Sequence, residues 1–95
     1  MILGKVVGTV VCSSKNDGIV GASYLLIEKT NQSGETKGDY LVALDIVGAG
    51  KDELVMITEG SPSRETPQTV NKPLDALIVG IVDLIDEHDR VIYRK

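Results

Sequence analysis

The sequence predicts an all-β fold, a small five-stranded antiparallel barrel with one short helix, and three observations support this prediction. The apolar residues are mainly β-branched, with 21 Val and Ile against 9 Leu and no Phe or Trp. Such residues favour pleated, half-buried surfaces. Turn-forming Gly, Pro, Asn and Asp divide the chain into short apolar segments, and only one place carries a helix-start signal. The 95 residues are expected to form one domain, residues 1–95.

Alternation of apolar residues places the individual elements. The expected strands cover residues 2–12, 22–30, 40–47, 53–59, 75–85 and 91–94, and the loops between them cover 13–21, 31–39 and 86–89. Gly4 and Gly8 fall on the apolar face of the first strand, which indicates a sharp bend or the close approach of a neighbour. Cys12, at the end of that strand, is interpreted as a packing residue.

The segment 75–85 is open to two interpretations. Its apolar residues also match helical spacing, namely Leu74, Leu77, Ile78, Ile81, Val82 and Ile85. Gly80 and the high content of Val and Ile disfavour a helix interior. A fifth strand is therefore the favoured interpretation.

Two glycine-anchored turns interrupt the strand pattern. The first, Gly48-Ala49-Gly50 followed by Glu53, lacks the spacing of a phosphate-binding loop and is expected to be a tight turn that requires positive φ. In the second, Gly60-Ser61-Pro62, Ser61 is expected to cap a short helix in which proline takes the first position. Arg64 either helps the helix N-terminus to bind an anion or bonds to a nearby carbonyl or carboxylate.

Composition argues against several classes of function. The net charge of −4 disfavours a protein that binds a nucleic-acid backbone. A single cysteine cannot form an internal disulfide, and neither a signal peptide nor a membrane-length apolar stretch is evident, so a soluble cytoplasmic protein is expected. His88 stands alone, and the acidic residues around it (Asp83, Asp86, Glu87 and Asp89) do not match a calcium loop. No catalytic activity, cofactor or metal is therefore expected.

The strands carry more apolar surface than one small barrel can bury. The segment 40–47 places Tyr40, Val42, Leu44 and Ile46 on one face and Leu41, Ala43 and Val47 on the other. An antiparallel sheet around a single core has one polar face. A second copy of the chain is the expected cover for the extra apolar face, and the alternative is a monomer that tolerates exposed apolar residues.

Taken in order and spacing, these features resemble the EutN/CcmL family, the vertex proteins of bacterial microcompartment shells. The resemblance is carried by Ile2 to Val10 (ILGKVVGTV), Asp45 to Gly50 (DIVGAG) with Glu53, Gly60-Ser61 with Arg64, Pro73-Leu74-Asp75, Ile78 to Asp83 (IVGIVD) and Val91 to Lys95 (VIYRK). The second turn departs from the Gly-Ser-Ser-Ala-Arg pattern usual in the family, because Pro62 and Ser63 stand in its middle.

The resemblance implies an OB-like barrel that assembles as a pentamer without enzymatic activity. It implies a place in the shell of a cytoplasmic bacterial microcompartment, beside hexameric shell proteins of another fold. On the charge and the lack of a membrane-length stretch, no nucleic-acid or membrane partner is expected. The candidate assembly residues are Gly48, Ala49, Gly50, Glu53, Gly60, Ser61, Arg64 and Asp83. The rival interpretations are an OB-like barrel that binds single-stranded nucleic acid, and a barrel that binds a small ligand.

Overall fold

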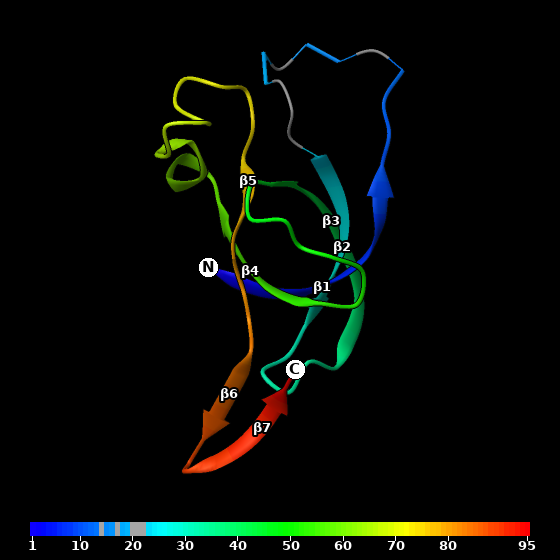
Figure 1. The fold of residues 1–95 in the computed structure, drawn as a ribbon, viewed down its shortest axis with the longest axis vertical. Helices are drawn as coiled ribbons and strands as arrows, with labels where there is room; N and C mark the ends of the chain where they lie inside the picture. The colour runs from blue at the N-terminus through cyan, green and yellow to red at the C-terminus, as the bar shows by residue number, and fades with distance from the viewer. Residues whose placement is uncertain (14, 17, 20–22) are drawn as a thin grey trace.

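Five strands form a closed barrel, and two more form a separate sheet (Figure 1). The computed structural model describes residues 1–13, 15, 16, 18, 19 and 23–95. In chain order the elements are β1 (Ile2–Val10), β2 (Ser23–Thr30), β3 (Thr36–Asp45), β4 (Leu54–Glu59), the 3₁₀ helix η1 (Ser61–Arg64), β5 (Ala76–Ile81), β6 (Leu84–Glu87) and β7 (Arg90–Arg94). This architecture confirms the predicted all-β barrel with one short helix. The expected start of the second strand, at residue 22, lies outside the described residues.

The barrel strands follow the order β1-β2-β3-β5-β4, and β1 closes the barrel against β4. Every neighbouring pair is antiparallel except β3 and β5, which run parallel and pair only at Leu44↔Leu77 and Asp45↔Ile78. The barrel is therefore continuous around its wall, but one of its seams is much shorter than the others.

The barrel encloses an aliphatic core contributed by all five strands. Its buried members are Val6, Leu25, Ile27, Ala43, Val55, Ile57, Ala76 and Ile78. A Cβ atom at Gly4 would overlap the side chain of Ile27, which confirms the close approach predicted at this glycine. Gly8 has ordinary space around it, and the pairing of β1 shifts register between Val6 and Gly8, so this glycine lies at a bulge that bends the strand.

A second buried cluster lies on the outer side of the wall. Its buried members are Leu44, Leu77 and Ile19. The partly buried residues packed against them are Tyr24, Ile46 and Leu74. The chain's own connecting segments therefore cover part of the extra apolar face for which the sequence predicted a second subunit. Farther along β3, Tyr40 and Val42 remain exposed in the single chain.

The fifth strand ends earlier than predicted. β5 stops at Ile81, and the backbone N–H of Val82 donates to the carbonyl of Leu54 at 2.8 Å. The chain then leaves the barrel wall to form the β6–β7 hairpin, hereafter the arm, which projects from one end of the molecule (Figure 1). His88 and Asp89 both have positive φ, as a two-residue type I′ turn requires, so the expected loop 86–89 shrinks to these two residues.

Two other predictions about strand ends are wrong. β3 starts at Thr36, because Asn31 folds the preceding loop tightly: its Oδ1 accepts hydrogen bonds from the backbone N–H groups of Ser33 and Glu35 at 2.9 and 3.0 Å. β1 ends at Val10, so Cys12 lies beyond the strand and is exposed. The interpretation of Cys12 as a packing residue is therefore wrong for the single chain.

Candidate assembly site

The first glycine turn is organised by the carboxylate of Asp45, at the end of β3. Its Oδ1 accepts hydrogen bonds from the backbone N–H groups of Val47 (3.0 Å) and Gly48 (3.1 Å), and its Oδ2 accepts one from Ala49 (3.0 Å). Gly48 has φ of 78°, which confirms the predicted need for glycine. Of the two glycines in this turn, Gly50 does not have positive φ. One carboxylate thus holds three successive amides.

Glu53 connects the same turn to the arm. Its carboxylate accepts a hydrogen bond from the backbone N–H of Gly50 and pairs with the ammonium of Lys95. Lys95 Nζ also lies 4.0 Å from Asp83 Oδ1, and the backbone N–H of Lys95 donates to the carbonyl of Asp83 at 2.9 Å. We call Gly50, Glu53, Asp83 and Lys95 the latch. It joins the first turn to the base of the arm.

The charges of the latch stabilise each other. The hydrogen bond from Lys95, followed by the one from the Gly50 amide, lowers the pKa of Glu53 below its usual 4.5. The hydrogen bond with Glu53 raises the pKa of Lys95 above its usual 10.5. Both groups are therefore charged across the neutral range, and the ion pair persists there.

The second glycine turn is tied to its own segment and to the strand that follows. Gly60 has φ of 72°, and its backbone N–H donates to the backbone carbonyl of Asp75 at 2.8 Å. The carbonyl of Gly60 accepts hydrogen bonds from the hydroxyl and the backbone N–H of Ser63, a fully buried residue. Gly60 occupies the cap position of η1, and no side chain caps this helix, so the predicted cap by Ser61 is wrong. Arg64 donates to the carbonyl of Leu74 at 2.8 Å, which is the carbonyl contact anticipated for this residue.

The eight predicted residues therefore fall into two groups. The latch brings together Gly50, Glu53 and Asp83, with Gly48 and Ala49 just before them. Gly60, Ser61 and Arg64 belong to the turn around η1, which lies toward the end of the barrel opposite the arm (Figure 1). Each turn has its own set of contacts, and the hydrogen bonds and ion pairs described for them do not join the two.

Sequence reasoning missed Asp45 and Lys95 as organising residues. Asp45 had a usable signal, since an aspartate at a strand end, shortly before a glycine, commonly accepts backbone hydrogen bonds in a turn. Lys95 had none, because its partners Glu53 and Asp83 lie 42 and 12 positions earlier in the sequence. Only the folded barrel brings the three together.

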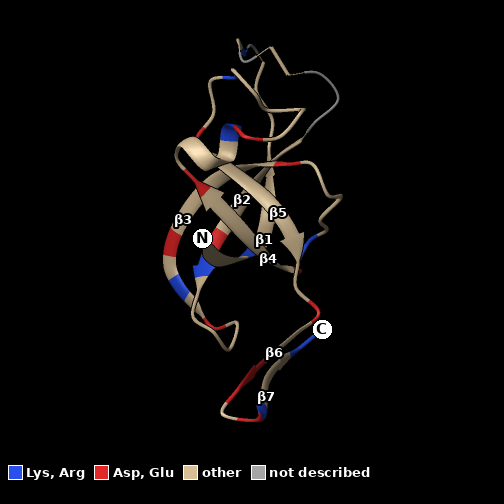
Figure 2. Cartoon of the chain, turned by 90° about the vertical axis from the view of Figure 1, so that its left-hand side faces the viewer, with Lys and Arg blue, Asp and Glu red and all other residues tan. Residues whose placement is uncertain are grey.

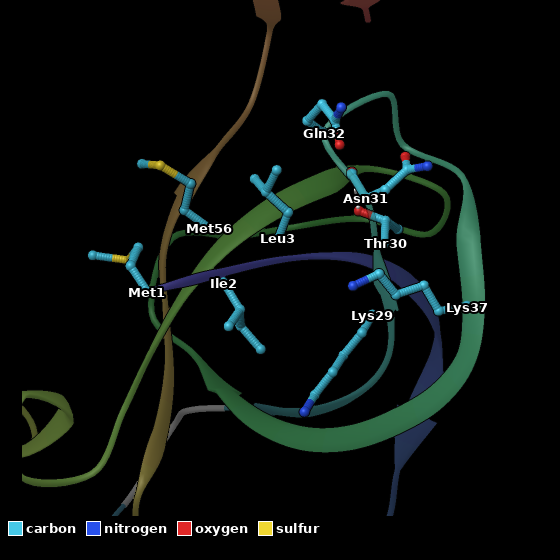
Figure 3. Close-up of a pocket in the computed structure, with 9 residues that line it drawn as sticks. All are labelled: Met1, Ile2, Leu3, Lys29, Thr30, Asn31, Gln32, Lys37 and Met56. Carbon is cyan, nitrogen blue, oxygen red and sulfur yellow. Dashed lines mark hydrogen bonds between the residues drawn. The ribbon is translucent and has the colours of Figure 1, made fainter.

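The surface carries an apolar groove near the start of β1 (Figure 3). Met1, Leu3 and Met56 form its apolar side, and Lys29 and Lys37 stand on the other side. The groove has a volume of about 550 Å³. Its polar groups are two lysines and the side chains of Thr30, Asn31 and Gln32, which suits a protein surface with acidic and apolar groups.

Acidic and basic side chains alternate over the part of the chain that the structure describes, which does not suit a nucleic-acid backbone. Lys and Arg are interspersed with Asp and Glu along the chain (Figure 2). Lys29 pairs with Asp39 at 3.5 Å, and Lys95 pairs with Glu53. Within residues 1–13, 15, 16, 18, 19 and 23–95, no group of three or more His, Cys, Asp or Glu could hold a metal ion. The same described residues include no helix of the length and apolarity needed to cross a membrane.

Comparison with known proteins places this barrel in one family. The family described as "Ethanolamine utilisation protein EutN/carboxysome" matches residues 1–83. The carboxysome shell vertex protein CcmL of Gloeobacter violaceus is 39% identical to this chain, over the whole of this chain and 95% of its own length. The solved structure of CcmL from that organism superposes with a TM-score of 0.94 and covers 100% of this chain and 98% of that one.

Relatives from other compartments show the same likeness. The microcompartment shell vertex protein EutN of Escherichia coli is 33% identical over the full length of both chains. The solved GrpN pentameric microcompartment shell protein of Rhodospirillum rubrum is 39% identical, with a TM-score of 0.80 over 92% of this chain and 99% of that one. Fold, length and sequence agree, and the chain belongs to the EutN/CcmL family of microcompartment shell vertex proteins.

Proposed function

We propose that this chain assembles into a ring of five copies that occupies the vertices of a bacterial microcompartment shell. The observation that carries the proposal is the likeness to shell vertex proteins over the full length of the chain, with GrpN a pentamer. The exposed apolar residues on β3 and in the groove supply surface for contacts between copies.

A fivefold ring has a geometric role in such a shell. Replacing a sixfold unit of a flat lattice by a fivefold one removes a wedge, and the lattice must then curve. Enough such replacements close the lattice into a polyhedral shell. The proposed partners are therefore hexameric shell proteins on the flat facets, which meet the rim of this ring.

The role proposed for the chain is structural. The polar contacts of both turns are made within the chain, as Asp45, Glu53 and Arg64 illustrate. These contacts fix the shapes of the two turns. A shaped rim is what a vertex protein requires, whereas binding of single-stranded nucleic acid requires a basic groove with stacking aromatic residues.

Native mass spectrometry tests the ring directly. The expected species has a mass of about 51 kDa, five times the 10.2 kDa of one chain. A chain that remains a monomer or a dimer at micromolar concentration would contradict the proposal. Co-expression with hexameric shell proteins then tests the vertex role, because closed polyhedral particles should form with this chain and open sheets or tubes without it.

A further inference from the structure

The arm is an element that its own barrel covers on one face only. Two-stranded sheets are marginally stable alone in water. One face of the arm packs on the 31–35 loop: a Cβ at Gly34 would lie 3.0 Å from the Tyr93 ring, and Gln32 Nε2 lies 3.4 Å from the Glu87 carboxylate. Ile85 pairs with Tyr93 and therefore points to this same face.

The other face of the arm is uncovered and exposes two aliphatic side chains. Because side chains alternate along a strand, Leu84 points away from the face that carries Ile85. Val91, which pairs with Asp86, and Arg94, which pairs with Leu84, lie on this outer face as well. Leu84 and Val91 are 47% and 49% exposed. The outer face thus presents two aliphatic side chains, with the acidic Asp86 opposite Val91 and the basic Arg94 opposite Leu84.

The arm is held in a defined position by the latch at its base. Lys95, next to the end of β7, bonds Asp83 just before β6 and pairs with Glu53 on the barrel. A projecting element that is fixed in this way loses less conformational freedom on docking than a loose one. The arm is therefore suited to contact a second molecule.

The geometry points to the Met1, Leu3 and Met56 groove of a neighbouring copy as the docking site for the outer face of the arm. This inference rests on the proposed ring. A closed ring is built head to tail, so it needs two different complementary surfaces on each copy. The arm and the groove are different surfaces, one projecting and one hollow.

Apolar and charged groups match between the two surfaces. Leu84 and Val91 fit the apolar side of the groove, where Met1 and Met56 are exposed. Asp86 then lies toward the lysine side, where Lys37 has no ion pair among the described residues. Opposite charges at such a contact fix register more than they add affinity.

The test compares Val91→Asp with Val70→Asp by native mass spectrometry over a dilution series. The two valines are 49% and 51% exposed, but Val70 lies in the segment after η1, away from the arm. Val91→Asp is expected to raise the concentration at which half of the chains are in rings by roughly tenfold, since burying one valine favours association by about that factor. Val70→Asp is expected to leave that concentration within about twofold, as surface substitutions usually do.

A charge exchange provides a second test that does not depend on the apolar contact. Lys37→Glu and Asp86→Lys should each weaken the ring by a few-fold, and the two together should restore it, because the exchanged pair is again complementary. If Val91→Asp affects the ring no more than Val70→Asp does, or if the single charge changes have no effect, the docking is overturned. The proposal of a ring would still stand in either case. A wild-type chain that never forms a ring contradicts both.

Discussion

The two glycine turns have the same backbone requirement but different connections. Gly48 and Gly60 have φ of 78° and 72°, and neither would bring a Cβ closer than 3.9 Å to another atom. The first turn is held by side chains at its two ends, Asp45 and Glu53, and through Lys95 it reaches the arm. The second is held by the backbone of Gly60, by the side chains of Ser63 and Arg64, and by the segment just before β5.

This difference separates two structural tasks. A turn that is closed on itself stabilises the barrel and gains little from a neighbouring chain. We propose that the first turn, which reaches the arm through the latch, sets the position of the arm and through it the fit between copies. On that proposal the same local sequence signal, a glycine with positive φ, serves folding in one place and assembly in the other.

The largest effect is expected from Asp45→Ala. The substitution removes the acceptor for three backbone N–H groups. Because hydrogen bonds to a charged group are stronger than neutral ones, the free energy of unfolding is expected to fall by about 2–3 kcal/mol. Chemical denaturation at fixed protein concentration measures it. Asp45→Asn is the control: it keeps the oxygen for the amides of Val47 and Gly48 and should lose about half as much. Equal losses for the two variants would contradict this account of the turn.

Gly48→Val is expected to weaken the ring more than it destabilises the barrel. A β-branched residue at positive φ costs on the order of 1–3 kcal/mol, and the turn can relieve this strain by moving, which displaces the latch. Gly60→Val should do the reverse, because the backbone of Gly60 is bonded on both sides within the barrel. The measurements are ring mass by native mass spectrometry and Tm of the same samples.

Gly38→Val serves as the matched control for the Tm measurement in that experiment. Gly38 has φ of 74° and, like Gly48, has open space within 4 Å of the position that a Cβ atom would take, but it lies in β3 outside both turns. An oligomer that is intact with Gly48→Val at the same concentration would show that the first turn serves folding of the single chain alone.

The smallest effect is expected from the latch, and its sign follows from the pKa directions. The pKa of Glu53 is lowered in the fold, so the stability it contributes is present above 4.5 and is lost as pH falls through the folded-state value. The pKa of Lys95 is raised, so its contribution is present below 10.5 and is lost as pH rises through the folded-state value.

Lys95→Met should therefore lower Tm slightly at pH 7 and leave it nearly unchanged once the pH is low enough to protonate Glu53 in the wild-type fold. Lys51→Met is the control, since Lys51 is exposed and the ion pairs of the described residues do not include it. A Tm difference between wild type and Lys95→Met that is the same at neutral and at acidic pH would mean that the ion pair does not act as described.

Local pattern predicted most of the barrel and part of the site. Alternating β-branched residues located the five wall strands, and Gly80 correctly decided between strand and helix for the segment after residue 75. The end of β5 was beyond such reasoning, because Val82, Leu84 and Ile85 continue the apolar run. The Val82 amide still bonds Leu54 at the start of β4, and beyond it the Asp83 carbonyl accepts from Lys95 instead of from the wall; both are contacts between distant segments.

The candidate site divides in the same way. Positive φ at Gly48 followed from the residue type, whereas the ion pair of Glu53 did not, because its partner Lys95 comes from the far end of the chain. Cys12 was misjudged for a related reason: an apolar strand pattern continues through Val11, but its pairing ends at Val10. Periodicity shows which side a residue faces, and pairing decides where a strand ends.

The short parallel seam between β3 and β5 has a mechanical consequence for a protein at the corner of a container. β3 pairs with β2 at seven positions but with β5 at only two. A wall under tension opens where the fewest backbone hydrogen bonds must break. Under a force that stretches the shell, a single subunit is expected to open first between β3 and β5. Contacts from neighbouring copies across these two strands would raise the force that is needed.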